Sequence, residues 1–232
     1  MGTNASDLEA GLALPLAEAM STQRAIRRLR NDPVDDDVVL RCLDLAIRAP
    51  TGSNRQGWEF VVVRDPAVKH QLARLNRQAW SVYRRLGGKQ ARQDPAMRKI
   101  VAAVEWQADH FEEVPVVVVA CLHGRSPVFP PVLAASYYGS IFPAVQNLLL
   151  AARAVGLGAG LVTLPLWSRT LARRTLGLPR SVTPVAVVPL GWPRGKYGPT
   201  TRRPVEEVVH LDRYGHQPFR RTARTSAPAA AE

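Results

Sequence analysis

The chain has 232 residues, enough for one domain with a sizeable core, and no linker-like stretch divides it. Hydrophobic residues make up 46% and charged residues 22% of the chain, which is ordinary for a globular protein. Its net charge of +12 favours anionic partners, among them nucleic acids, membrane surfaces and phosphorylated small molecules. A solvated basic surface explains the same charge, so the charge alone names no ligand.

Several protein classes are disfavoured by what the chain lacks. It has no run of about 18 apolar residues, and its N-terminus lacks a signal-peptide layout, so we expect neither a membrane span nor secretion. Cys42 and Cys121 lie in apolar patterns, which predicts buried, reduced thiols and a cytoplasmic protein. No metal-ligand spacing, Walker loop or Gly-x-Ser-x-Gly motif occurs, so we expect no metal site.

The pattern of apolar residues, glycines and prolines predicts helices that alternate irregularly with a few strands. In chain order, helices are expected at residues 15–29, 35–49, 65–86, 94–113, 133–155 and 167–176. Strands are expected at residues 60–63, 114–120, 161–163 and 182–190. These elements predict an α+β fold in which helices cover a small mixed sheet.

Three segments carry more specific information. Residues 114–120 show no alternation, which is typical of a strand buried on both faces. Residues 133–155 are apolar nearly all round, so this helix should be buried in a core or at a subunit interface. Gly156–Gly160 resembles a dinucleotide-binding loop, but a helix precedes it and a strand follows, so we interpret it as a helix end that runs into a strand.

Two kinds of candidate binding residue remain. The loop Pro50–Trp58 is rich in small hydrogen-bonding side chains, which allow close approach to a flat heteroaromatic ligand, although a simple turn has the same composition. Arg24 and Arg27 near one end of the chain, and Arg202 and Arg203 near the other, could converge on one phosphate. Solvent exposure explains these arginines equally well when they are taken alone.

Four blocks of sequence, in the same order, resemble the nitroreductase family. They are Arg24–Val34, Ala49–Val63 (APTGSNRQGWEFVVV), Gln146–Gly158, and Pro189–Pro193 together with Arg202–Glu207. The resemblance covers about residues 20 to 210. It implies an α+β fold, an intertwined obligate homodimer with FMN at the interface, and a place for helix 133–155 in the dimer core. The implied organisation is an N-terminal helical extension over residues 1–19, an FMN domain over 20–215 and a disordered tail over 216–232.

The resemblance also assigns roles to residues. Arg24, Arg27, Arg28 and Arg202 should hold the FMN phosphate; Pro50, Thr51 and Ser53 should line the isoalloxazine ring; and Asn54 should hydrogen-bond the flavin or its ribityl chain. Val162, Thr163 and Leu164 should lie near the N5 edge, with their backbone N–H groups towards it. Gln23 and Ala25 depart from the family pattern, so Arg27 or Arg28 must contribute more to phosphate binding. Gly57 replaces the family's common proline before Trp58, which should loosen the loop without removing the Asn54 contact. No side chain is assigned the chemistry, since the flavin carries it.

The implied function is an FMN-dependent, NAD(P)H-consuming oxidoreductase that reduces a nitroaromatic or quinone by a ping-pong mechanism. Its expected partners are a second copy of the chain and a small-molecule acceptor, with no nucleic acid and no membrane. An alternative is a flavoenzyme of the same fold with a non-nitro substrate, either dehalogenase-like or flavin-modifying, because Leu164–Leu166 is similar to the deiodinases' Thr-Pro-Leu. A basic nucleic-acid-binding or flavin-binding protein is the remaining alternative.

Overall fold

A computed structural model of the protein describes residue 12 and residues 14–87 and 94–220. The helices are α2 (Leu16–Thr22), α3 (Asp36–Ala46), α4 (Pro66–Gly87), α5 (Pro95–Asp109), α6 (Pro131–Gly139), α7 (Phe142–Ala154) and α8 (Arg169–Thr175). Short 3-10 turns are η1 (Gly52–Asn54), η3 (Phe111–Glu113), η4 (Leu164–Leu166) and η5 (Val205–Glu207). Residues 221–232 of the expected disordered tail (216–232), and residues 1–11 and 13 of the expected N-terminal extension, lie outside the described residues.

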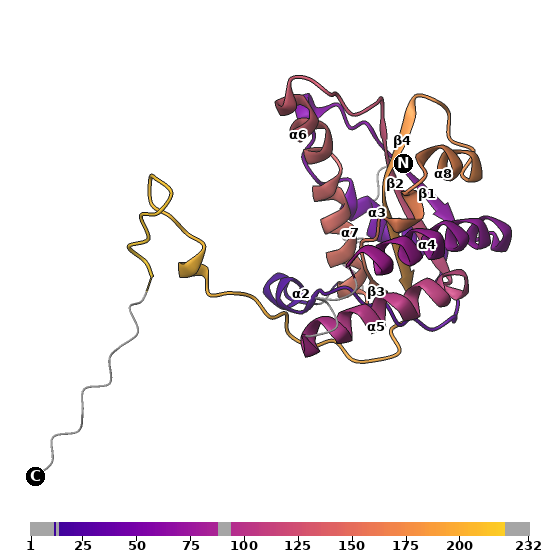
Figure 1. The fold of residues 1–232 in the computed structure, drawn as a ribbon, viewed down its shortest axis with the longest axis horizontal. Helices are drawn as coiled ribbons and strands as arrows, with labels where there is room; N and C mark the ends of the chain where they lie inside the picture. The colour runs from indigo at the N-terminus through magenta and orange to yellow at the C-terminus, as the bar shows by residue number, and fades with distance from the viewer. Residues whose placement is uncertain (1–11, 13, 88–93, 221–232) are drawn as a thin grey trace, which may run out of the picture. The chain divides into compact units, whose positions relative to one another are not determined.

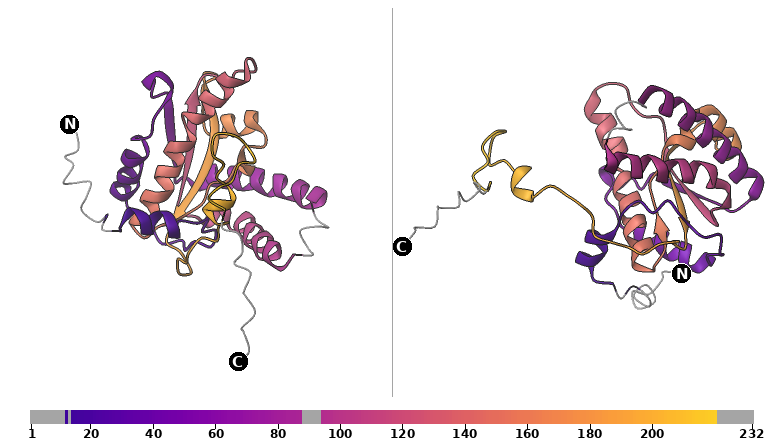
Figure 2. Two further views of the ribbon diagram at one scale, coloured as in Figure 1. Left: turned by 90° about the vertical axis from the view of Figure 1, so that its left-hand side faces the viewer. Right: turned by 60° about the horizontal axis from the view of Figure 1, so that its bottom comes forward.

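Four strands form one sheet in the order β1-β2-β4-β3. They are β1 (Trp58–Val63), β2 (Val116–His123), β3 (Gly158–Ala159) and β4 (Val182–Gly191). Each pairing among the described strands is antiparallel, so the α+β class is confirmed but the sheet is not mixed. Antiparallel pairing of β1 and β2 follows from the helical hairpin α4–α5, which returns the chain to the end of the sheet where β1 left it (Figure 2).

Helices cover both faces of the sheet (Figure 1). One face packs on α3 and α7 through side chains such as Val39 and Leu148. The other face packs on α4, η3 and α8 through side chains such as Leu72, Phe111 and Ala172. Residues 116–122 of β2 are buried without interruption, as the lack of alternation predicted.

The predicted helix over residues 15–29 is wrong beyond Thr22. Residues 23–30 are extended instead, because the backbone finds partners at the end of the sheet. The Ile26 N–H donates to the Ala159 carbonyl at 2.9 Å, and the Arg30 N–H donates to the Trp192 carbonyl at 2.8 Å. These long-range hydrogen bonds outweigh the weak local preference for helix. The arginines of this segment are therefore displayed on an extended chain rather than on a helix.

The predicted helix over residues 133–155 is also wrong in one respect, because it is two helices. α6 ends at Gly139 and α7 begins at Phe142. Pro143 lies in the first turn of α7 and has no N–H to continue the hydrogen-bond ladder of α6. Proline is tolerated in a first helical turn, so the break falls where the sequence places Pro143.

Gly156–Gly160 connects a helix end to a strand, as predicted. Gly156 has a φ of +83°, and the Leu157 N–H donates to the Ala152 carbonyl at 2.8 Å, which closes α7. β3 follows directly at Gly158, and the strand expected at 161–163 is a single bridge between Val162 and Val187. Cys42 and Cys121 are buried, free thiols, as expected.

The chain divides into two compact units, residues 1–198 and 199–232. The second contains η5 and a short turn in which the Leu211 N–H donates to the His216 carbonyl at 2.8 Å. Among the described residues, no helix is long and apolar enough to span a membrane.

Candidate functional site

A cavity of about 310 Å³ lies between the helical hairpin α4–α5 and the segment that follows β3. This volume is within the range of small-molecule sites, roughly 300–1,000 Å³. The cavity brings together two of the segments to which the sequence assigned cofactor contacts. Its lining residues are Arg27, Asn76, Trp80, Tyr83, Met97, Ile100, Val101, Val104, Gln107, Leu161, Val162, Thr163 and Leu164.

Arg27 is the single cation of this lining. Its guanidinium is partly buried, and this desolvation lowers its pKa. Within the described parts of the chain, no carboxylate lies within salt-bridge distance of Arg27, nor of its neighbours Arg24 and Arg28. A partly buried cation without a partner is unfavourable, so this position is suited to an anionic ligand.

The cavity also holds hydrogen-bonding groups that sequence reasoning missed. Asn76 on α4 and Gln107 on α5 are 4% and 3% exposed. Trp80 Nε1 and Gln107 Nε2 are buried donors with no hydrogen-bond partner. A signal for Asn76 was present in the sequence, because it belongs to the helical stripe formed by Leu72, Leu75 and Ala79. An amide on such an apolar stripe indicates a polar function inside the protein.

The backbone of residues 162–164 offers two free donors rather than three. The Val162 N–H donates to the Val187 carbonyl at 2.8 Å, so it is not available to a ligand. In the described structure, the N–H groups of Thr163 and Leu164 have no acceptor, since η4 begins at Leu164. The expected contribution of this segment is thus reduced to Thr163 and Leu164.

The loop after Pro50 holds an unusual backbone. Ser53, Asn54 and Gln56 have φ angles of 52°, 51° and 48°, a region that is costly for residues with side chains. The Gln56 N–H donates to Thr51 Oγ1 at 3.0 Å, and Gln56 Nε2 donates to Asn54 Oδ1 at 3.2 Å. Strain that local hydrogen bonds maintain in this way favours a functional role for the loop.

A second cavity of about 370 Å³ adjoins this loop and α6. Thr51 and Ser53 line it, whereas Pro50 and Asn54 are exposed and are not among its lining residues. The Gly52 N–H donates to Ser140 Oγ at 3.0 Å, which ties the loop to the end of α6. A β-carbon on Gly52 would lie 2.9 Å from Ser136 Oγ, so a larger residue here would force the Ser136 side chain to move.

One chain does not bring the two halves of the predicted site together. The loop 50–57 leads into Trp58, which pairs with Leu122 at the end of the sheet where β4 begins. Leu29, two residues after Arg27, pairs with Pro193 beyond the other end of β4. β4 has 10 residues, so these ends are about 30 Å apart. Figure 1 shows α6 at the upper end of α7, and β3 with α2 near its lower end.

Arg202, the remaining predicted phosphate contact, belongs to the second compact unit. It is exposed, and its Nη1 donates to the Thr201 carbonyl at 2.8 Å. Its role in phosphate binding stays a prediction.

The residues of the main cavity fit FMN by their chemistry. FMN combines an anionic phosphate with a flat ring that carries hydrogen-bond acceptors. Arg27 supplies an unpaired cation, and Thr163 and Leu164 supply free N–H donors. The rest of the wall is largely apolar and aromatic, which suits a flat ring. Among the described residues, no group of His, Cys, Asp and Glu has the arrangement of a metal site.

Fold and cavity together define an α+β protein with a largely apolar pocket that also holds a cation and hydrogen-bond donors. Residues 20–192 match the sequence model of the Nitroreductase family, and the chain belongs to that family. It is 32% identical over 209 residues to an NADH dehydrogenase of Thermus thermophilus, covering 84% of this chain and 97% of that one. The family and this relative make the protein an oxidoreductase.

Two further relatives differ in what their names say they do. The chain is 31% identical over 211 residues to a 5,6-dimethylbenzimidazole synthase of Rhodospirillum rubrum, covering 84% of this chain and 87% of that one. Its fold is similar to that of an iodotyrosine deiodinase bound to FMN and 3-iodo-L-tyrosine, with a TM-score of 0.66 and 21% identity. The similarity covers 86% of this chain and 98% of the deiodinase chain. Membership of the family therefore leaves the substrate open.

Proposed function

We propose that the protein is an FMN-dependent oxidoreductase that takes a hydride from NAD(P)H and reduces an electron-poor acceptor of the nitroaromatic or quinone type. The observation that carries this proposal is the unpaired, partly buried Arg27 in one cavity with the free N–H groups of Thr163 and Leu164. A cation for a phosphate and donors for a ring edge are the two features that FMN requires of its site.

The residues of this chain would bind and orient the cofactor. Arg27, with Arg24 and Arg28, would hold the phosphate, and Arg202 would add a fourth guanidinium. The N–H groups of Thr163 and Leu164 would donate to the ring edge and stabilise negative charge there. When bound, FMN supplies two-electron chemistry by accepting a hydride from NAD(P)H and passing two electrons to the acceptor in a separate, ping-pong half-reaction.

The side chains of α4 and α5 would control access to the site. Met97, Ile100, Val101 and Val104 form an apolar wall that would exclude water from the reacting groups. Asn76 and Gln107 would donate hydrogen bonds to the cofactor or the acceptor, and this would satisfy Gln107 Nε2, a buried donor that has no partner in the described structure.

A second copy of the chain is needed to complete the site as the sequence assigns it. Arg27 and the loop 50–54 lie near opposite ends of the sheet, too far apart for one small ligand to contact both in one chain. In a homodimer with two-fold symmetry, the loop of one subunit would meet the arginines of the other, and two equivalent sites would result. Exposed apolar side chains on α6, including Val132 and Leu133, offer part of the surface that such a dimer would bury.

A non-nitro substrate is the second candidate function. The sequence similarity to a 5,6-dimethylbenzimidazole synthase favours it, because that relative is nearly as similar as the NADH dehydrogenase. Assays of nitroaromatic, quinone and halotyrosine substrates side by side would separate the two candidates. Nucleic-acid binding is a weaker third candidate, supported by the charge of +12 alone. Tight, steeply salt-dependent binding to duplex DNA, without NAD(P)H oxidation, would favour it.

The direct test of the proposed function is spectroscopic. The purified protein should be yellow, should release FMN on denaturation, and should lose its visible absorbance when NAD(P)H is added without oxygen. A colourless protein that added FMN does not reconstitute would contradict the proposal.

A further inference from the structure

The long segment from Val114 to Val205 contains no Asp or Glu. Its basic residues are Arg125, Arg153, Arg169, Arg173, Arg174, Arg180, Arg194, Lys196, Arg202 and Arg203. Only one of them, Arg153, makes a salt bridge among the described residues, to Glu18 at 3.6 Å. This segment supplies the Val162–Leu164 side of the main cavity and all of α8. The part of this segment that lies in the first compact unit, α8 included, therefore adds positive charge and no carboxylate of its own to this side of the cavity.

A smaller cavity of about 200 Å³ continues the site on this basic side. Thr163 lines both this cavity and the main one, so the two cavities meet at this residue. Arg169, the first residue of α8, is the single cation of the smaller lining. The aromatic rings of Tyr138 and Phe142 line it as well, 6.1 Å apart and inclined by 30°.

The described linings of both cavities lack carboxylates. The main cavity has Arg27, Asn76 and Gln107 as its charged or amide side chains, and the smaller cavity has Arg169 with two threonine hydroxyls. An ammonium group in the smaller cavity would meet the positive charge of Arg169 and no carboxylate among the described lining residues. A carboxylate in the smaller cavity could instead form a charge-assisted hydrogen bond with Arg169.

We propose that the acceptor is a planar aromatic anion, of the aromatic carboxylate class, whose ring lies against the cofactor on the Thr163 side of the main cavity and whose negative charge is recognised by Arg169. This inference rests on the proposed function. It names Arg169 as a specificity-determining residue and disfavours substrates with a free amino group, among them halotyrosines. The rings of Tyr138 and Phe142, which line the smaller cavity with Arg169, fit the planar part of such an acceptor.

The test compares three nitroaromatic acceptors that differ mainly in charge: para-nitrobenzoate, para-nitrobenzyl alcohol and para-nitrobenzylamine. In each reaction NAD(P)H supplies a hydride, solvent supplies a proton, and the nitro group becomes a nitroso group with release of water. The wild-type kcat/KM should be highest for the benzoate and lowest for the amine. Arg169→Gln should lower kcat/KM for the benzoate about tenfold, the effect of one charge-assisted hydrogen bond, and leave the alcohol unchanged.

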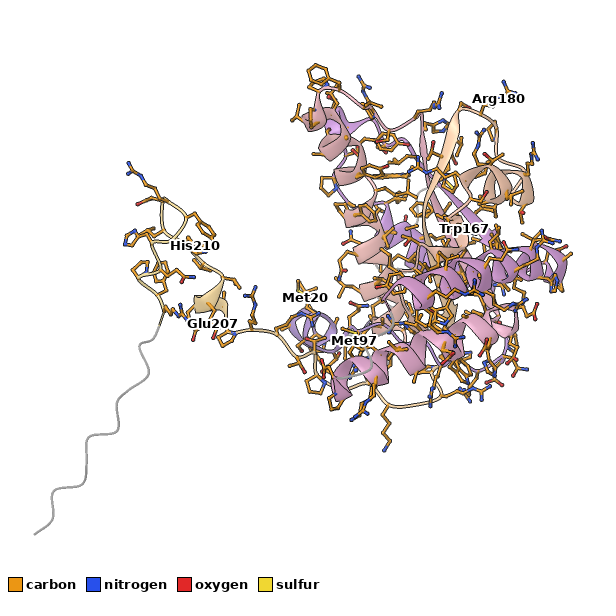
Figure 3. The ribbon with its side chains drawn as sticks, in the orientation of Figure 1. Met20, Met97, Trp167, Arg180, Glu207 and His210 are labelled. Carbon is orange, nitrogen blue, oxygen red and sulfur yellow. The ribbon has the colours of Figure 1, made fainter. Side chains whose placement is uncertain are left out.

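Arg180→Gln is the matched control. Arg180 is exposed, belongs to the same acid-free segment and makes no salt bridge, but it lines neither cavity. Figure 3 shows it at the turn that follows α8, pointing away from the helix. Its kcat/KM values should match those of the wild type. Equal kcat/KM for the three acceptors, or equal losses in Arg169→Gln and Arg180→Gln, would overturn the proposal. Failure of the proposed function itself would be distinct, because the neutral alcohol would then not be reduced either.

Discussion

Gly158 and Leu29 lie so close together that a β-carbon on Gly158 would be 2.6 Å from Leu29 Cδ2. The same β-carbon would be 2.8 Å from Ile26 Cγ2. Both side chains flank Arg27 in the extended segment that replaces the predicted helix. The glycine in β3 thus lets the arginine segment lie against the end of the sheet and fixes its path.

Gly158→Ala should therefore weaken both folding and cofactor binding. Two side chains anchored in the core would have to shift, which typically costs about 1–3 kcal/mol. The free energy of unfolding from urea denaturation should fall by that amount, and FMN should bind several-fold more weakly. Gly195→Ala is the control, because nothing lies within 4 Å of its added β-carbon. Equal stability of the two variants would contradict this role for Gly158.

Arg27→Gln should separate phosphate binding from ring binding. If Arg27 holds the phosphate, the variant should bind FMN about 10–100-fold more weakly, because a charge-assisted hydrogen bond contributes about 1.5–3 kcal/mol. Affinity for riboflavin, which has no phosphate, should change little. Fluorescence titration with the two flavins measures both. Arg30→Gln is the control. Arg30 already forms a salt bridge with Asp32 at 3.2 Å, so this variant should keep an FMN affinity near the wild-type value. A parallel loss of FMN and riboflavin binding would remove the phosphate role of Arg27.

Gln107→Leu should have opposite effects on stability and on cofactor binding. Gln107 is 3% exposed, and its Nε2 is a buried donor with no hydrogen-bond partner in the described structure. A leucine of similar volume removes the cost of burying an unpaired amide, so the cofactor-free protein should be about 1 kcal/mol more stable. FMN or the acceptor should bind more weakly. A destabilised cofactor-free variant would show that the amide serves the fold instead.

The two cysteines predict how stability changes at high pH. Burial raises the pKa of the Cys42 and Cys121 thiols from 9.0 to about 12. A raised pKa in the folded state means that the stabilising contribution is complete below pH 9 and is lost as the pH rises to about 12. At about pH 10.5 each thiol should account for a loss of about 2 kcal/mol. The decline between pH 8 and 10.5 should be smaller in Cys42→Ala, and an unchanged slope would contradict the assignment.

Local rules predicted most elements because their signals are local. Three such signals each act within a few residues. They are the run of valines in β2, the Asp65 carboxylate that accepts a hydrogen bond from the Ala67 N–H at the start of α4, and Gly156, which ends α7. The helix over 15–29 failed because Ile26 and Arg30 bond to residues more than 130 positions away, which no local pattern reveals.

The candidate site was predictable only in part, for the same physical reason. Arg27 and Thr163 could be assigned because the family resemblance spans them, and the structure places both at one cavity. Gln107 escaped detection because an isolated amide on an amphipathic helix resembles an ordinary surface residue until packing buries it. Asn76 was missed although its place on an apolar helical stripe was visible in the sequence. The hydrogen bond from the Val162 N–H to the Val187 carbonyl could not be predicted either, since it depends on the pairing with β4.

The central claim is that each FMN site takes its arginines from one subunit and its 50–54 loop from the other. Mixed dimers test it most directly. Arg27→Gln and Asn54→Ala homodimers, each impaired in FMN binding, are unfolded together, refolded and separated by distinct affinity tags. In the heterodimer one site would carry both substitutions and the other site would carry neither.

The isolated heterodimer should recover one FMN site with wild-type affinity. Titration with FMN at a known protein concentration measures the number of sites and their affinity. If both segments served the same site within one chain, every site in the heterodimer would carry one substitution. No tight site would then be recovered, and this result would contradict the account.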